Sequence, residues 1–233
     1  KSILMKTKIF LALIFVSSIL FGQDSLQQDL KVKSALVTFN PSKVARNTNG
    51  LNLGVLDDYQ KQRINGINIQ ANPITLLYLL IPKAIEIPTE GEETVTINGL
   101  HLSTGGMMDG KRLNGVGISM YHIAQETNGI SVNGFNSNIG KMNGLQISWL
   151  NNAIKKGNGL QLSFSNEAEK FNGLQIGIGN EIDSGNGVQI GFYNSTKKLK
   201  GVQVGVINRS EKRGLQIGFW NRNSKRTMPF INF

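Results

Sequence analysis

The sequence predicts an all-β protein, a repeat β-solenoid of about eleven short coils with terminal caps. Three observations support this prediction: a unit that begins with Gly recurs at nearly constant spacing, apolar and polar residues alternate after each Gly, and Asn recurs at the same two places. Alternation with a period of two is typical of a strand with one buried and one exposed side. Self-similarity at a fixed period indicates a repeat architecture.

The repeat units are 13 to 16 residues long, apart from one interval of 33 residues. The first and third residues after the initiating Gly are apolar in every unit, as in Leu174 and Ile176. A variable, charged segment ends each unit and is expected to form a solvent-facing loop. The initiating glycines are Gly50, Gly66, Gly99, Gly115, Gly129, Gly144, Gly159, Gly173, Gly187, Gly201 and Gly214.

Asn marks two corners of the unit. It precedes the initiating Gly in nine copies, and because Asn-Gly readily adopts positive φ, we expect a tight bend there. Another Asn recurs seven residues after the Gly, where its side-chain amide can bond the equivalent Asn of the neighbouring coils. These residues are Asn136, Asn151, Asn166, Asn180, Asn194, Asn208 and Asn221.

The second residue after the Gly becomes Gln in the last six units. Since the flanking residues are apolar, we expect Leu174 and Ile176 to face the core and the glutamines to form an exposed ladder. The fourth residue is mostly Gly or Ser, which would keep that ladder flat. The ladder is the candidate binding site and comprises Gln146, Gln161, Gln175, Gln189, Gln203 and Gln216.

The same unit also fits an antiparallel β-barrel or meander. Alternating residues could face lipid and water, aromatic residues could form a girdle, and the sequence given ends in Phe233. Against a barrel, its entry and exit corners would alternate between two ends of the sheet, whereas every copy has the same Asn-Gly entry. The units also provide fewer than the roughly nine to eleven residues of a membrane-spanning strand. The solenoid is therefore favoured.

Four regions follow from this pattern. Residues 1–22 contain Lys6 and Lys8, a short apolar run and Gly22, which is typical of a secretory signal peptide. Residues 23–48 are interpreted as an N-terminal cap and 49–226 as the repeat domain. An apolar insert, 73–97, is interpreted as a flap over the first coils. Residues 227–233 interrupt the repeat with a Pro and are interpreted as a C-terminal cap.

Charge and composition narrow the function classes. The absence of Cys excludes disulfides, Cys-ligated metal sites and a thiol nucleophile. The net charge is +10, and removal of residues 1–22 would leave 22 basic and 15 acidic residues, or +7. The basic residues near the C-terminus could attract acidic polymers, but no aromatic residues are interleaved as in nucleic-acid grooves, so we expect solvated loops and no nucleic-acid partner.

The sequence contains little that could support catalysis. His101 occupies a Gln position and His122 an Asn corner, and neither has a recurring carboxylate at metal-ligand spacing. We interpret both histidines as polar surface residues. No catalytic residue, metal site or cofactor is therefore expected, and the chain is not predicted to be an enzyme.

Units written Asn-Gly-Leu-Gln-Ile-Gly, with Val in place of Leu in the second, occur at 172–180 and 186–194, each ending in Asn, and a related unit with an aromatic residue before the final Asn occurs at 214–221. Together with the closing segment 219–233, they resemble uncharacterised exported surface-repeat proteins of Gram-negative bacteria. The resemblance covers roughly residues 47–233. It implies a location in the cell envelope or at the surface, and because the family has no established activity, it implies no catalytic residue.

The hypothesis from sequence is thus an exported, non-enzymatic module of the cell surface, outer membrane or periplasm. Its Gln and Gly/Ser ladder would present a platform to a glycan or a surface protein, with membrane association as a further option. The alternative is an outer-membrane β-barrel with a transport or scaffold role. The sequence leaves the ligand, the role of the insert and the oligomeric state open.

Overall fold

The structure is a computed structural model that describes residues 33–40, 47–55, 61–72, 95–104, 111–212 and 214–233. All of them belong to the unit Val32–Phe233. The predicted signal peptide, 1–22, lies outside the described residues, as do most of the predicted N-terminal cap and residues 73–94 of the predicted insert. No helix in the described parts of the chain is long and apolar enough to be a membrane span.

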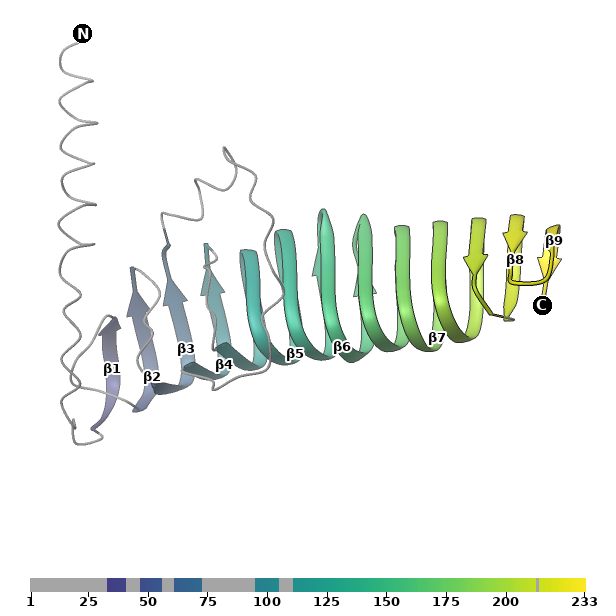
Figure 1. The fold of residues 1–233 in the computed structure, drawn as a ribbon. Coiled ribbons are helices and arrows are strands. Elements are labelled where there is room, and N and C mark those ends of the chain that lie inside the picture. The colour runs from purple at the N-terminus through teal and green to yellow at the C-terminus, as the bar shows by residue number, and fades with distance from the viewer. Residues whose placement is uncertain (1–32, 41–46, 56–60, 73–94, 105–110, 213) are drawn as a thin grey trace, which may run out of the picture. The chain divides into compact units, whose positions relative to one another are not determined.

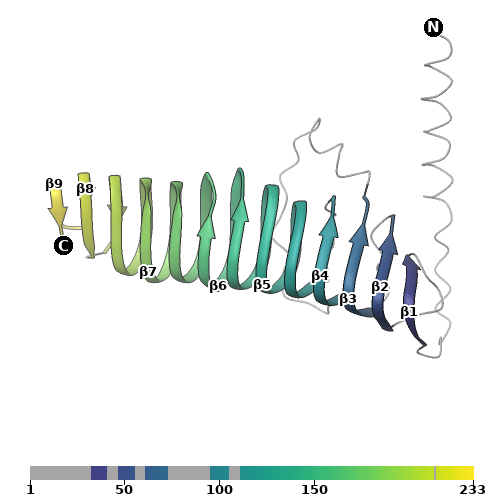
Figure 2. The same cartoon turned by 180° about the vertical axis from the view of Figure 1, so that it is seen from behind.

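The described residues form one sheet in which the strands follow each other in chain order (Figures 1 and 2). Neighbouring strands from β1 to β8 pair in parallel, and the two longest continue around the corners through several coils. This is a β-solenoid of about ten turns, so the solenoid prediction is confirmed and the antiparallel barrel or meander is not favoured. The strands are β1 (Ser34–Asn40), β2 (Asn47–Gly54), β3 (Gln62–Gln70), β4 (Val95–Ser103), β5 (Lys111–Ser148), β6 (Asn151–Leu162), β7 (Ser165–Ser210), β8 (Leu215–Arg222) and β9 (Thr227–Asn232).

The sequence repeat and the register of the sheet coincide. Gly50 pairs with Gly66, and Gly66 pairs with Gly99 although 33 residues separate them. Gly144, Gly159 and Gly173 pair in the same way across β5, β6 and β7. The long interval therefore corresponds to one coil that carries additional residues, and the stack continues in register on both sides of it.

The Asn-Gly corners have the backbone that the dipeptide predicts. The nine repeat glycines that follow Asn have φ values between 131° and 155°. At Gly173, where φ is 148°, a Cβ atom would also overlap the carbonyl oxygen of Gly159 in the preceding coil. Gly is thus required at this corner both by the backbone conformation and by the close approach of the neighbouring coil.

The two ends of the stack differ from the sequence prediction in detail. Ser34–Asn40, inside the predicted cap 23–48, is already a strand of the parallel sheet and pairs Val37 with Leu51. Val95 and Ile97, assigned above to the insert, belong to β4 and are buried. At the other end, β9 turns back and pairs antiparallel with β8, which ends the parallel ladder.

Candidate functional site

The Gln ladder lies inside the solenoid, so the prediction that it faces solvent is wrong. Each Gln side-chain nitrogen from Gln161 onward donates a hydrogen bond of 2.8–3.0 Å to the Gln oxygen of the preceding coil. No member is more than 2% exposed. Because they are buried, the six glutamines cannot form the exposed binding site that was predicted for them. These residues are Gln146, Gln161, Gln175, Gln189, Gln203 and Gln216.

The buried glutamines are well paired within the coil. Besides its ladder bond, the side-chain nitrogen of Gln189 donates to the backbone oxygen of Ser195, at 3.1 Å, across the interior. Gln175 makes the same contact with Glu181, at 3.3 Å. At the end of the stack, Asn232 of β9 donates to the oxygen of Gln216 at 3.1 Å. A buried amide with both hydrogens bonded avoids the cost of an unpaired polar group.

A second amide ladder runs beside the first. Asn166, Asn180, Asn194 and Asn208 each donate to the Asn of the following coil at 2.8–2.9 Å and to a backbone carbonyl. The predicted bonding between equivalent asparagines is thus present. Two predicted members differ. Asn152, and not Asn151, bonds Asn166, because the coil that begins at Gly144 is one residue longer before this corner, and Asn136, which pairs with Asn151, is likewise displaced from the ladder.

The Gly at the fourth position also faces the interior. A Cβ atom on Gly191 would lie 2.5 Å from the side-chain nitrogen of Asn180 and 3.2 Å from the side-chain oxygen of Asn194. The small residue therefore leaves room for the Asn ladder. Its predicted role, keeping an exposed Gln ladder flat, is wrong for the same reason as the orientation of the glutamines.

Two histidines and a lysine occupy the interior of the earlier coils. His101 and His122 are no more than 1% exposed, so their interpretation as surface residues is wrong. His101 Nδ1 lies 2.8 Å from Asn68 Nδ2, and His101 Nε2 lies 3.3 Å from Lys111 Nζ. Burial, followed by the charge of Lys111, lowers the pKa of His101 well below its usual value and that of His122 to about 3. Both rings are therefore neutral at pH 7.

The interior group does not form a metal centre with other ligands. Within the described ranges, no three His, Asp or Glu side chains are placed so that they could hold a metal ion. His122 Nε2 lies 3.0 Å from Thr127 Oγ1. The arrangement is a buried polar cluster that continues the interior ladder from Asn68, and it has no opening to a substrate in the described structure.

The apolar residues that flank the glutamines form the outer surface of the same segment. We call this surface the apolar face. It consists of the first, third and fifth residues after each repeat Gly in the last six units, and none of its members is fully buried. Leu174 and Ile176, predicted to face the core, belong to it. Its members are Leu145, Ile147, Trp149, Leu160, Leu162, Phe164, Leu174, Ile176, Ile178, Val188, Ile190, Phe192, Val202, Val204, Val206, Leu215, Ile217 and Phe219.

The apolar core lies in the return segment of each coil, by which we mean the residues between the ladder Asn and the next repeat Gly, such as 181–186. Phe171, Ile182 and Leu199 point inward with Ile139, Met142, Ile154 and Ala168 and form one buried cluster. A second cluster, formed by Ile64, Val95, Ile97 and Leu113, fills the earlier coils. Since the glutamines bond the backbone of the return segment across the interior, the apolar face and the return segment lie on either side of it.

The outer surface of the return segments is charged, and we call it the charged side. Glu169, Glu181, Lys197 and Lys198 are exposed there. Lys197 Nζ lies 2.7 Å from Asp183 Oδ1, and the hydrogen bond to that carboxylate raises the pKa of Lys197. Acidic and basic groups alternate on this side, whereas the apolar face has no charged residue.

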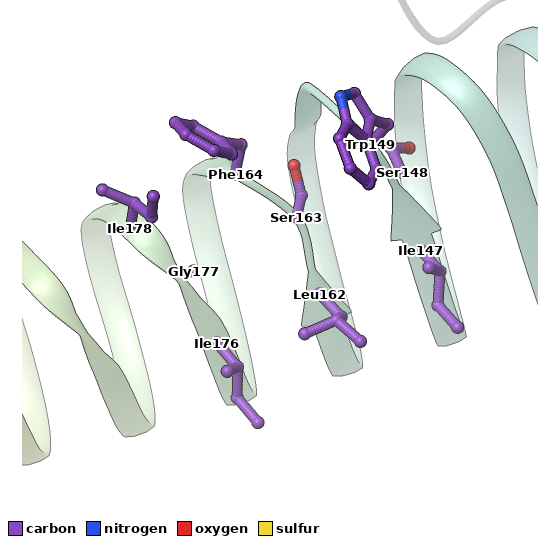
Figure 3. A pocket seen from close by; sticks show the side chains of 9 residues that line it. All are labelled: Ile147, Ser148, Trp149, Leu162, Ser163, Phe164, Ile176, Gly177 and Ile178. Carbon is purple, nitrogen blue, oxygen red and sulfur yellow. The ribbon is translucent and has the colours of Figure 1, made fainter.

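A shallow hollow lies on the apolar face across three successive coils and has a volume of about 410 Å³. Ile147, Leu162 and Ile176 form one row along it, and Trp149, Phe164 and Ile178 form a second row (Figure 3). Trp149 is 70% exposed and Phe164 56% exposed. Ser148, Ser163 and Gly177 lie between the two rows.

The apolar face offers contact surface and no reactive group. Its side chains cannot donate or accept protons, act as nucleophiles or bind a metal. A continuous exposed apolar surface of this kind is typical of an interaction site. Comparison with protein-family models, with curated proteins and with solved structures finds no match to the chain.

Proposed function

We propose that the protein is an exported, non-enzymatic module of the cell envelope that binds its partner through the apolar face. The observation that carries the proposal is the composition of that face: every member is apolar, and Trp149 and Phe219 are 70% exposed. The largest apolar patch of an ordinary monomer covers about 300–600 Å². An uncovered apolar surface of greater extent favours association with another surface.

The chemistry of the face favours a protein or lipid partner over a glycan. A ligand site for a polar molecule needs donors and acceptors placed among its apolar residues. The three columns of the apolar face have a single donor, the indole N–H of Trp149, and the amides that were expected to supply the others are bonded inside the coil. A bound sugar would therefore leave most of its hydroxyl groups on that side unpaired.

Export and an envelope location are supported by the sequence alone. The basic, apolar and small-residue segments of 1–22 have the order of a secretory signal, and the repeat resembles exported surface-repeat proteins. The proposal expects the mature chain to begin close to Gln23. Mass spectrometry of the N-terminal peptide from the envelope of a Gram-negative host tests this. An uncut chain in the cytoplasm would contradict it.

The binding role is tested by retention in the envelope. The full chain is compared with a Leu162→Lys, Phe192→Lys double variant, in which two charges stand on the apolar face. The control is Glu169→Gln with Glu181→Gln, which changes the net charge by the same amount on the charged side. We expect the lysine variant to wash out of the envelope fraction at least tenfold more readily, and the control to be retained. Equal retention of all three would contradict the proposal.

A further inference from the structure

We infer that the partner of the apolar face is a second copy of this chain, which packs its own apolar face against the first. This inference rests on the proposed function, in which that face is the binding surface, and it names the partner. Two copies related by a two-fold axis would use the same patch twice. The two sheets would pack face to face at about 10 Å, as in other stacked sheets.

The area of the face matches what a stable dimer requires. An aromatic side chain has roughly 150–250 Å² of surface and an aliphatic one somewhat less, so the face, with members between 39% and 70% exposed in every coil, presents on the order of 1,000 Å². A stable interface buries about 800 Å² on each partner. The apolar face alone therefore suffices, without contributions from the charged side.

The period of the face favours a copy over an unrelated protein. The same three outward positions recur in each coil, and the coils follow one another at the spacing of paired strands, about 4.8 Å. A second copy has the same period, so a fit achieved at one coil is repeated at all of them. A partner without this repeat would fit at few positions along the stack.

The apolar face has both a hollow and projecting side chains that could fill the hollow of a second copy. The hollow between Leu162 and Ile176 has a volume of about 410 Å³ and is apolar. On the same face, Phe192 is 56% exposed and Phe219 70% exposed, so they project from the surface. Side chains of this size can enter the hollow of a facing copy and fill it, which increases the number of van der Waals contacts.

The distribution of charge permits two copies to meet despite their equal net charge. The chain carries a net charge of +10, yet the apolar face contains no charged side chain. The charged side also mixes acidic residues such as Glu169 and Glu181 with lysines. Interfacial membrane elements combine their apolar side with a basic polar side that attracts anionic lipids, and residues 145–233 include 12 basic and 5 acidic residues, so binding to lipid vesicles is measured beside dimerisation.

The inference is tested by the mass of the purified full chain in sedimentation equilibrium, over a wide range of concentrations. We expect a dimer for the unaltered chain, a monomer for the Leu162→Lys, Phe192→Lys variant, and a dimer for the Glu169→Gln, Glu181→Gln control. Thermal unfolding of the lysine variant verifies that it remains folded. If that variant is unfolded, Ile190→Lys alone, which places one charge on the face, replaces it.

A second readout uses the absence of Cys from the chain. A single Ile190→Cys thiol should be alkylated at least tenfold more slowly at concentrations where the dimer forms than at high dilution. A single Glu169→Cys thiol on the charged side should react at the same rate in both conditions. Slow alkylation that depends on concentration at position 190 only would place the apolar face in the interface.

The outcomes separate this inference from the proposed function. A monomeric chain at every concentration, or a dimer that persists in the lysine variant, would overturn the second copy as partner. If a monomeric chain floats with phosphatidylethanolamine and phosphatidylglycerol vesicles and the lysine variant does not, lipid is the partner and the proposed function stands. If neither vesicle binding nor envelope retention depends on the face, both are overturned.

Discussion

The interiors of the coils before Gln146 and after it contain different polar groups. After Gln146, Gln recurs at one inward position of every coil and Asn at another, and their side-chain amides form two uninterrupted ladders. Before it, the column that begins with Thr38 and Asn52 continues through Asn68 and His101, and Gly117 then interrupts it. Inside the early coils the partners of the polar groups therefore change from coil to coil.

The difference is visible in the pairing of buried groups. Buried side-chain atoms without a hydrogen-bond partner include Gln62 Nε2, His122 Nδ1, Gln125 Oε1 and Asn136 Oδ1. Among the described residues after Gln146, the atoms in this state are Asn151 Oδ1, Asn152 Oδ1 and Thr196 Oγ1, and beyond Asn152 only the last of these remains. An amide carries both a donor and an acceptor, so a column of amides at the same register lets each side chain accept from one neighbour and donate to the next. Identical residues in successive coils therefore satisfy a buried polar column that a mixed set of residues satisfies incompletely.

The largest expected effect comes from breaking a complete ladder with a charge. In Gln189→Glu, the donor to Gln175 is replaced by a carboxylate that faces the oxygens of Gln175 and Ser195. We expect a loss of roughly 3–5 kcal/mol at pH 7, measured by chemical unfolding. Because burial raises the pKa of the new carboxyl group, the loss should shrink as the pH falls and the group is protonated.

Removing a buried polar group from the early coils should cost less stability than breaking the Gln ladder. Ser131→Ala removes a buried hydroxyl that accepts from Asn133, but Asn133 also donates to the backbone oxygen of Ile147. We expect a loss of about 1 kcal/mol or less. A loss as large as that of Gln189→Glu would contradict the distinction between the two interiors.

Replacing a repeat Gly by Ala should cost different amounts of stability at different corners. Gly173→Ala places a Cβ at positive φ and against the carbonyl oxygen of Gly159, so we expect a loss of about 3 kcal/mol. At Gly214 the nearest atoms to an added Cβ are 3.6 Å away, and Gly214→Ala should change the stability by less than about 0.5 kcal/mol. Thermal unfolding of both variants measures the difference, and equal losses would refute the role of the close approach.

The outward orientation of Ile176 predicts a smaller loss of stability when a charge is placed there. Ile176 was expected in the core, where an Asp would cost several kcal/mol, but it is partly exposed on the apolar face. We now expect Ile176→Asp to cost about 1 kcal/mol, which is the scale of strand preference at an exposed site. Ile182→Asp, in the buried cluster of the return segment, is the matched core change and should unfold the protein. Chemical unfolding distinguishes the two.

The smallest effect at neutral pH concerns the two histidines. Their folded pKa values lie below 6.5, so the unfolded chain binds more protons and stability falls as the pH decreases from 6.5 towards the folded values. Hydrogen exchange at pH 7 and pH 5 should show β4 and the start of β5 losing protection, with β7 unchanged. His101→Asn, which restores the residue type found at Asn68, should reduce this loss. Equal loss in β7 would contradict it.

The sequence allowed the repeat, the register and the Asn-Gly corners to be predicted because each depends on backbone geometry. Asn-Gly readily adopts positive φ, and the nearly equal spacing of Gly144, Gly159 and Gly173 brings them into register. The orientation of the strands could not be predicted by hydropathy. Alternation shows that a strand has two sides, but the rule that the apolar side is buried fails when buried amides pair between coils.

One signal for that orientation was present in the sequence. A Gln that recurs at every coil can bond its own equivalent above and below, which is the reasoning that correctly placed the Asn ladder. Applied to both amides, it would have placed Gln175 and Asn180 inside together. His101 stands at the position that the glutamines occupy, so the same reasoning would have placed it inside. The interior position of Lys111 could not have been recognised in this way, because Lys occurs at that register in a single coil.

Hydrogen exchange of the glutamine side-chain amides, measured by NMR on chain labelled at glutamine, tests most directly the claim that the amides form the interior and the aliphatic residues the outer surface. The claim predicts that the side-chain amides of Gln161, Gln175, Gln189 and Gln203 exchange orders of magnitude more slowly than free glutamine, because they are buried and bonded. Exchange at the rate of free glutamine would contradict it and return the ladder to the surface.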